Sequence, residues 1–352
     1  MVNADAGGPG MAQAAAANGP DAPRAQAAGE HGPGGPGLSA AELAGLAPRA
    51  ALRRARDALA AAGCPDPEFD ARELLRLVLD ADPRLAEAPL TARQAGRFAA
   101  LCQKRRERFP LQYLAGRWPF LDFTLAVGPG VLIPRADSET VCLAAAECLR
   151  GTEAPAVLDL CAGSGALALG IKRLVPGARV TALEKSPGAL CYLAQNAAAA
   201  LAGFAGGAAR GAAGPEFSEE QPPKAAPDGP AVTVVEGDVF AYQNTLAPAS
   251  LDLILSNPPY LTGEEMRVLQ PELCYEPAMA LDGGPDGLRF YRHIASAYRF
   301  ALRRGGALVL EVGWQQAGAV AALLAQNGWQ AIETRRDLGG NPRVVLARAP
   351  AG

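Results

Sequence analysis

The stretch "LDLCAGSGALALG", Leu158 to Gly170, is an apolar run followed directly by a glycine turn and a helical pattern. Gly163 and Gly165 stand where a strand would turn into a helix, and the missing Cβ there lets backbone N–H groups approach a ligand closely. The next apolar run ends in Glu184, 19 positions after Gly165, close to the spacing at which an acidic side chain accepts ribose hydroxyls. Together these features predict a pocket for an adenosine-bearing cofactor.

From about residue 138 onward, short strand-like runs alternate with helical patterns. Each run is nearly continuous in apolar residues, which is typical of a parallel sheet covered by helices on both faces. Only residues 335–342 separate the last two runs, so we expect these two strands to form an antiparallel hairpin at one end of the sheet. The predicted strands are 156–160, 179–184, 231–237, 251–257, 306–313, 329–334 and 343–349.

The N-terminal part of the chain has a different character. Residues 1–37 are mostly Gly, Ala and Pro, and we predict that they form a disordered tail. Ser39 and Glu42 then have the spacing of a capping box, which predicts the start of a helix. Further helical patterns at 68–79 and from Thr91 onward indicate a small all-helical domain over residues 38–115, which leaves residues 116–350 as the main domain.

Two segments of the main domain interrupt the alternation of strands and helices. The stretch "FLDFTLAVGPGVLIP", residues 120–134, predicts a hairpin with Gly128-Pro129-Gly130 at its turn. Residues 203–230 carry turn-forming and charged residues without apolar periodicity, so we interpret them as a flexible surface insertion.

Composition limits the classes of function. The 352 residues carry a formal net charge of −3, which argues against a large nucleic-acid footprint. The basic stretch "QKRRERF", residues 103–109, is interpreted as the solvated end of a helix. No window reaches the length of a membrane span, and the N-terminus does not resemble a signal peptide, so we expect a cytoplasmic protein. Seven scattered cysteines and only two histidines, His31 and His293, offer no framework for a metal site.

The short glycine turn, Cys161 to Gly165 with Asp159 just before it, lacks the longer fingerprint of dinucleotide-binding folds. It resembles the first motif of S-adenosylmethionine-dependent methyltransferases. In that family the order of strand, glycine turn, second strand ending in an acid, and final antiparallel strand is the usual fold. The resemblance implies an α/β fold with a Rossmann-like, seven-stranded class I methyltransferase domain, and S-adenosylmethionine as cofactor.

The tetrapeptide "NPPY", Asn257 to Tyr260, ends the fourth predicted strand and so lies at the same edge of the sheet as the glycine turn. It resembles the motif with which amino-methyltransferases hold a planar nitrogen. The side-chain oxygen of Asn257 and the carbonyl oxygen of Pro258 are acceptors suited to the N–H groups of such a nitrogen. Pro258 and Pro259 fix their positions in advance, and Tyr260 is expected to stack on the planar group. Direct transfer from sulfonium to nitrogen then needs no covalent intermediate and no strong base.

Flanking segments carry a further resemblance, which bears on the substrate. "PLQYLAG" (110–116), "LIPRADSE" (132–139), "NPPY", "LEVGWQQ" (310–316) and "DLGGNPR" (337–343) resemble, in that order, the release factor glutamine methyltransferase family. The resemblance spans roughly residues 40 to 348. It implies a protein-(glutamine-N5) methyltransferase that acts on the glutamine in the Gly-Gly-Gln (GGQ) motif of class I peptide chain release factors and modulates translation termination. The helical unit at 38–115 would help to hold this protein substrate.

Residue by residue, the resemblance implies the following roles. Glu184 would bind the ribose, Val239 would line the adenine, and Asn257 would face both the methyl donor and the substrate. Cys161 replaces the more usual glycine, and we expect its backbone to avoid a positive φ. The cofactor loop would comprise Cys161, Ala162, Gly163, Ser164 and Gly165, and the substrate would meet Asn257, Pro258, Pro259 and Tyr260.

Other interpretations remain open from the sequence. A sister enzyme that methylates a glutamine of a ribosomal protein shares the fold and the tetrapeptide. A nucleic-acid methyltransferase acting on adenine N6 or guanine N2 should carry a basic cleft or a target-recognition domain and must flip its base out. A non-catalytic binding module would have little reason to keep Asn257 and Tyr260. We expect a monomer without direct nucleic-acid or membrane contacts, and we leave Arg135, Glu139 and Glu311 outside the catalytic set.

Overall fold

The computed structural model describes residues 37–204 and 232–351. Apart from their boundary residues, the tail predicted at 1–37 and the insertion predicted at 203–230 lie outside these ranges. Over the described ranges, no helix is long and apolar enough to cross a membrane.

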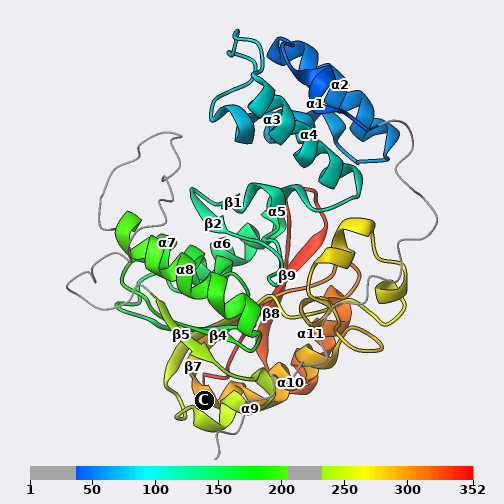
Figure 1. Cartoon of the computed structure of the whole chain (residues 1–352). Helices are drawn as coiled ribbons and strands as arrows, with labels where there is room; N and C mark the ends of the chain where they lie inside the picture. The colour runs from blue at the N-terminus through cyan, green and yellow to red at the C-terminus, as the bar shows by residue number, and fades with distance from the viewer. Residues whose placement is uncertain (1–36, 205–231, 352) are drawn as a thin grey trace, which may run out of the picture.

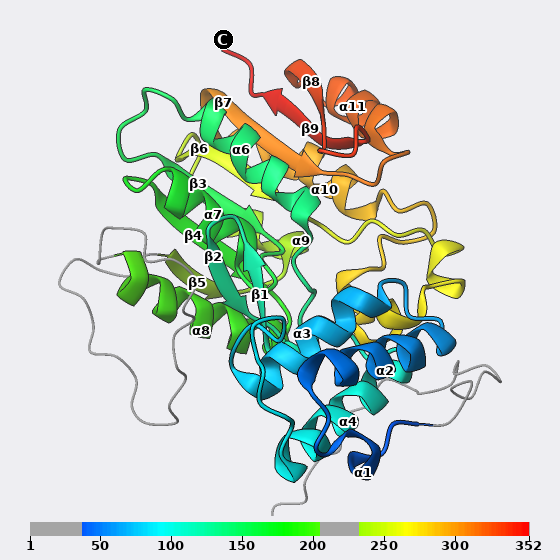
Figure 2. The ribbon, with the colours of Figure 1, turned by 90° about the horizontal axis from the view of Figure 1, so that it is seen from above.

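A seven-stranded sheet forms the centre of the main domain (Figures 1 and 2). The strand order is β5-β4-β3-β6-β7-β9-β8. All neighbours are parallel except β9, which runs antiparallel to both β7 and β8. This confirms the predicted α/β class and the terminal hairpin. The strands are β3 (Ala156–Leu160), β4 (Arg179–Glu184), β5 (Val232–Glu236), β6 (Leu251–Ser256), β7 (Leu302–Glu311), β8 (Gln330–Arg336) and β9 (Pro342–Arg348).

Helices cover both faces of this sheet (Figure 2), and successive strand residues divide between two cores. Val157 packs in the cluster beneath α6 (Glu139–Cys148), α7 (Ala166–Leu174) and α8 (Pro187–Phe204), whereas Leu158 packs in the cluster beneath α10 (Arg289–Ala297) and α11 (Ala317–Gln326). Because side chains alternate between faces, a strand that is buried on both sides must be apolar throughout. Shorter helices complete this domain: η1 (Ala136–Ser138), α9 (Val239–Tyr242), η2 (Gln243–Thr245), η3 (Glu265–Arg267), η4 (Pro271–Tyr275), η5 (Ala278–Ala280) and η6 (Arg299–Ala301).

A separate two-stranded hairpin precedes the sheet. Strands β1 (Arg117–Phe120) and β2 (Phe123–Ala126) pair through Phe120 and Phe123, so the turn is Leu121-Asp122. The prediction of a turn at Gly128-Pro129-Gly130 is therefore wrong. Leu121 takes a φ of 50°, as the first residue of a two-residue hairpin loop can require. The glycine-proline stretch instead follows the hairpin.

The N-terminal helices have a core of their own, with Leu59, Leu74 and Phe98 fully buried in it. The capping box is confirmed, because the Ser39 hydroxyl accepts the Glu42 N–H and Glu42 Oε2 accepts the Ser39 N–H. The helix that it starts ends after one turn at Leu43, followed by Gly45 with a φ of 76°. The helices are α1 (Ala40–Leu43), α2 (Pro48–Ala61), α3 (Pro67–Leu79), α4 (Ala92–Arg106) and α5 (Leu111–Ala115).

Candidate active site

The glycine turn joins β3 to α7 and contains three left-handed residues. Cys161, Gly163 and Gly165 have φ values of 61°, 57° and 86°. The expectation that Cys161 avoids a positive φ is therefore wrong. Its neighbour Ala162 donates its N–H to the Leu183 carbonyl of the adjacent strand (2.9 Å). The buried residue Ser164 is held through its carbonyl, which accepts from Asn196 Nδ2 at 2.9 Å. The turn is thus anchored on both sides.

Glu184 ends β4 beside this turn. Its Oε2 accepts the Gly163 N–H at 2.7 Å, and its Oε1 accepts the backbone N–H groups of Lys185 (2.8 Å) and Ser186 (2.7 Å). A carboxylate has about four acceptor positions, so three backbone donors leave room for one further donor. Glu184 therefore fixes the shape of the glycine turn while keeping capacity for a ligand hydroxyl.

Asn257 leaves the sheet directly beside the glycine turn. Leu160 of β3 and Ser256 of β6 are in register, and the Ser256 hydroxyl donates to the Leu160 carbonyl at 2.6 Å. The next residue in each strand, Cys161 and Asn257, therefore emerges at the same edge. The structure thus brings together the glycine turn and the tetrapeptide that the sequence places at the ends of separate strands.

The tetrapeptide itself is held rigidly. Pro258 and Pro259 are buried, whereas Asn257 and Tyr260 are partly exposed. The Tyr260 carbonyl accepts from Gln316 Nε2 at 2.8 Å, and a Cβ at Gly283 would lie only 2.7 Å from Tyr260 Cα. Burial raises the pKa of the Tyr260 phenol to about 12, so the ring is neutral at ordinary pH. Gln316 lies within the quoted segment 310–316, but nothing in the sequence marked it as a support of this turn.

Val239 begins α9 on the other side of the glycine turn. Its side chain is only 5% exposed and packs in the core beneath α10, so it offers little surface to a ligand. The Val239 carbonyl accepts from the Tyr298 hydroxyl at 2.8 Å and lies 3.0 Å from His293 Nε2. Asp238 caps α9 by accepting the Phe240 N–H at 2.9 Å. His293 is thus a partly buried side chain that supports the start of α9.

Glu311 ends β7 next to the tetrapeptide and is 1% exposed. Burial raises the pKa of its carboxyl group to about 7. The Ser138 hydroxyl donates to Glu311 Oε2 at 2.5 Å, and Asn257 Nδ2 donates to the Ser138 hydroxyl oxygen at 3.4 Å. Sequence reasoning set Glu311 aside and did not single out Ser138. The strand register could have drawn attention to Glu311, because Ser256 pairs with Leu310 and Asn257 therefore follows beside it.

Arg135 and Glu139, which the sequence analysis leaves outside the catalytic set, have separate partners. Arg135 pairs with Glu276, and Glu276 also accepts the Ile133 N–H at 2.9 Å. Glu139 accepts the Leu121 N–H at 2.8 Å. Glu276 belongs to the segment of residues 261–282 that follows the tetrapeptide. Arg135 therefore ties this segment to the chain before η1.

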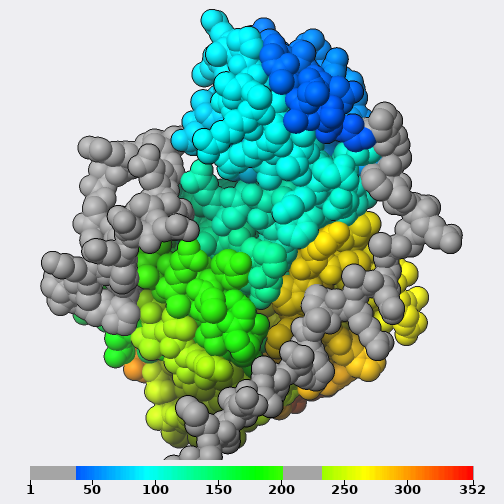
Figure 3. Space-filling view, viewed as in Figure 1, coloured from blue at the N-terminus to red at the C-terminus, as the bar shows by residue number. Residues whose placement is uncertain are grey.

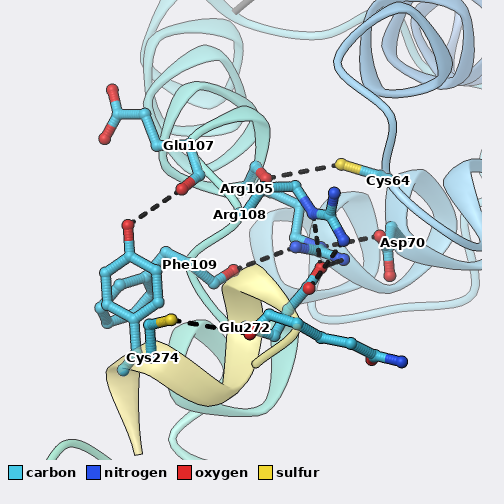
Figure 4. A network of polar contacts seen from close by, with 10 residues as sticks. Cys64, Asp70, Arg105, Glu107, Arg108, Phe109, Glu272 and Cys274 are labelled. Carbon is cyan, nitrogen blue, oxygen red and sulfur yellow. Dashed lines mark hydrogen bonds and ion pairs between the residues drawn. The ribbon is translucent and has the colours of Figure 1, made fainter. Parts of the chain in front are cut away.

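The helical unit contacts the same segment, which is coloured yellow in Figure 3. Figure 4 shows Arg105 of α4, and Arg108 two residues beyond the end of this helix, reaching toward Glu272 of η4. Arg105 bonds both Asp70 (2.7 Å) and Glu272 (2.9 Å), and Arg108 contacts both oxygens of Glu272 at 2.7 Å. Arg105 is only 4% exposed. The interpretation of residues 103–109 as a solvated helix end is therefore wrong for Arg105 and Arg106, which are both buried.

A cavity of about 580 Å³ lies between the helical unit and the segment 261–282. Its lining includes Phe69 of α3, Gln112 of α5 and Leu261, the residue directly after Tyr260. The cavity thus begins one residue beyond the tetrapeptide in the chain, while Asn257–Tyr260 themselves do not line it. Among the described residues, no group of three or more His, Cys, Asp or Glu side chains is placed to hold a metal ion.

Comparison with known proteins agrees with this geometry. Residues 50–116 match the model of the PrmC N-terminal domain. The chain is 36% identical over 306 residues to the release factor glutamine methyltransferase of Deinococcus radiodurans, which covers 86% of this chain and 98% of the relative. It is 35% identical over 263 residues to the enzyme of the same description from Geobacter sulfurreducens, with 74% and 81% covered. The chain belongs to the release factor glutamine methyltransferase family.

The residues at the sheet edge fit the S-adenosylmethionine cofactor of this methyltransferase family. A Cβ at Gly163 would meet no atom within 4 Å, so open space lies beside the glycine turn. Glu184 reaches this turn and has an acceptor position to spare. Asn257 borders the turn from β6. A ligand that carries both a hydroxylated sugar and a reactive group would therefore find its partners within one edge of the sheet.

Proposed function

We propose that this chain transfers a methyl group from S-adenosylmethionine to the side-chain nitrogen of the glutamine in the GGQ motif of class I peptide chain release factors. One observation carries the proposal: Asn257 emerges beside the glycine turn, because Leu160 and Ser256 pair in neighbouring parallel strands. A nitrogen held at Asn257 would therefore lie next to a group held at the turn.

The substrate nitrogen needs to be gripped and aimed, because the lone pair of an amide is delocalised and the nitrogen is a weak nucleophile. The Asn257 side-chain oxygen and the Pro258 carbonyl oxygen would accept its two N–H groups. Pro258 and Pro259 are buried and fix these acceptors before the substrate arrives, so orientation supplies much of the rate enhancement. The neutral Tyr260 ring would cover the planar amide and exclude water.

When bound, S-adenosylmethionine supplies a methyl carbon activated by its sulfonium. Gly163 and its neighbours in the loop Cys161–Gly165 would hold the cofactor through backbone N–H groups. Glu184 would accept one ribose hydroxyl through its remaining acceptor position. Val239 would contribute only a small apolar surface to the adenine, because it is almost fully buried.

The helical unit, residues 38–115, would recognise the protein substrate together with the segment 261–282. The cavity between them is lined by Leu261, the residue that follows the tetrapeptide in the chain. It has room for an extended loop that would bring a glutamine to Asn257. This position suits a protein loop. The cavity is lined by the helical unit and by the segment 261–282, two surfaces between which an extended peptide would lie.

The test is methyl transfer from labelled S-adenosylmethionine to three substrates offered separately: a class I release factor, ribosomal proteins, and nucleic acid. We expect label in the release factor alone. Label in ribosomal protein alone would keep the glutamine chemistry and overturn the substrate. Label in nucleic acid alone would overturn the protein substrate altogether.

A further inference from the structure

The Asn257 side chain is the end of a chain of three hydrogen-bonding groups from three elements. Asn257 follows β6, Ser138 lies in η1, and Glu311 ends β7. Asn257 Nδ2 donates to the Ser138 hydroxyl at 3.4 Å, and this hydroxyl donates to Glu311 Oε2 at 2.5 Å. Ser138 and Glu311 are 3% and 1% exposed. Bulk water therefore does not compete for the hydrogen bonds that these two buried groups make.

The direction of these hydrogen bonds decides whether the oxygen or the NH2 group of the Asn257 amide stays available to the substrate. An ionised carboxylate accepts only, so Glu311 forces the hydroxyl hydrogen of Ser138 to point toward it. The hydroxyl oxygen is then left as an acceptor, and it takes the NH2 group of Asn257. The oxygen of Asn257 remains for another donor. A reversed amide would offer NH2 to the substrate nitrogen, which cannot accept it.

We propose that Ser138 and Glu311 are positioning residues that hold the Asn257 amide with its oxygen toward the substrate nitrogen. The inference rests on the proposed function, because it assigns a purpose to the oxygen of Asn257 in gripping the glutamine amide. Neither residue touches the reacting atoms, so both act through Asn257.

The charge of Glu311 provides a signature that a purely structural role would not produce. Burial raises the pKa of Glu311 to about 7, while the Ser138 hydroxyl and Arg343 act to lower it. Above this pKa the ionised Glu311 carboxylate accepts from the Ser138 hydroxyl, and the Asn257 amide is held with its oxygen toward the substrate. Below it, the protonated group can donate to Ser138, whose hydrogen is then free to point at Asn257 and favour the reversed amide. The kcat should therefore rise as pH increases through about 7. Other ionisable groups that face Glu311 are Arg135, Asp137, Tyr260, Tyr291 and Cys142.

The experiment measures kcat, KM for the release factor and the affinity for S-adenosylhomocysteine in the full chain. Ser138→Ala removes the link to Asn257, and kcat should fall roughly 10-fold because a misplaced acceptor loses orientation. Ser138→Thr keeps the hydroxyl and should recover most of this loss. Glu311→Gln cannot ionise and should give a low kcat without the rise near pH 7. Ser296→Ala and Glu153→Gln alter exposed residues elsewhere and serve as matched controls.

Affinity for S-adenosylhomocysteine should stay within about twofold of the parent in each variant, since none of these groups bonds the glycine turn. A kcat for Ser138→Ala equal to that of the parent would overturn the inference. If Ser138→Ala does not fold, the pH profile of the parent decides, and a kcat independent of pH between about 6 and 8 would overturn it as well. Failure of the parent to methylate the release factor would instead refute the proposed function.

Discussion

At the scale of single residues, the sequence indicates where the backbone turns through left-handed φ values, but it does not indicate every residue that adopts them. Gly163 and Gly165 were predictable as turn residues from their place after an apolar run. Cys161 was not, since its φ of 61° follows from the direction in which the chain must leave β3 toward Ala162 and its bond to Leu183. A left-handed φ in a non-glycine residue costs about 1 kcal/mol, which the surrounding contacts offset.

The two glycines of the turn should respond differently to alanine. Gly163→Ala meets strain from a φ of 57° but no neighbouring atom, so it should destabilise the fold by only about 1 kcal/mol. Its methyl group would project into open space where the cofactor is proposed to bind, and affinity for S-adenosylmethionine should fall roughly 10-fold or more. Gly165→Ala places a Cβ 2.6 Å from Leu193 Cδ1 and should cost about 2 to 3 kcal/mol. Urea unfolding and calorimetric titration separate the two effects, and equal stability losses would contradict this distinction.

Asn257→Ala should separate binding from transfer. The side chain of Asn257 bonds Ser138 and does not bond the glycine turn, so cofactor affinity should change by less than about threefold. Loss of an acceptor that orients the nucleophile should reduce kcat by roughly 100-fold or more. Titration with S-adenosylhomocysteine and single-turnover methyl transfer measure the two quantities. A parallel loss of affinity and rate would show that Asn257 serves the cofactor and not the substrate.

At the scale of elements, strand-like runs predicted all seven strands of the sheet. The signal is most direct for β3 and β6, which are largely buried on both faces and therefore apolar, whereas the edge strand β8 is mostly exposed. The predicted position of the β1–β2 turn was wrong because Gly-Pro-Gly is a strong turn signal wherever it occurs, whereas Leu121-Asp122 carries none. The prediction that the basic end of α4 is solvated was wrong for another reason. Arg105 is buried by Glu272, which lies 167 positions later, and no local pattern reveals such a partner.

Glu272 provides a test of how α4 is joined to the segment 261–282. Burial alone would raise the pKa of Glu272, but its hydrogen bonds with Arg108 and Arg105 hold it below the usual 4.5. Glu272→Gln should lower the free energy of unfolding at pH 7 by about 2 to 3 kcal/mol, since it leaves buried Arg105 with Asp70 as its carboxylate partner. The matched control is Glu87→Gln, which changes an exposed glutamate.

The ion pair of Glu272 should also make the difference in the free energy of unfolding between the parent and Glu272→Gln depend on pH. A lowered pKa in the folded state means that the stabilisation is complete above the unfolded pKa and is lost as pH falls through the folded value. The parent and Glu272→Gln should therefore differ most at pH 7, and the difference should be smaller at about pH 3, below the usual pKa of a glutamate, as the parent begins to lose the charge. Urea unfolding at both pH values measures this, and a difference that stays constant would assign it to packing rather than to charge.

At the scale of the whole molecule, the sequence predicted the class of fold and the shared edge of the glycine turn and the tetrapeptide, because parallel strands place their carboxyl ends together. It could not predict how the helical unit lies on the main domain. That arrangement depends on a few contacts between segments far apart in the chain, such as the Tyr275 hydroxyl donating to the Glu107 carbonyl at 2.9 Å. The cavity beside Leu261 exists only through this arrangement.

The most direct test of the central claim is peptide mass mapping of a class I release factor after incubation with the full chain and S-adenosylmethionine. We expect one added methyl group on the side-chain nitrogen of the GGQ glutamine, with the product nearly absent when Asn257→Ala replaces the parent. A methyl group on any other residue, or an equal yield from Asn257→Ala, would contradict the assignment of this sheet edge as the site that grips the glutamine.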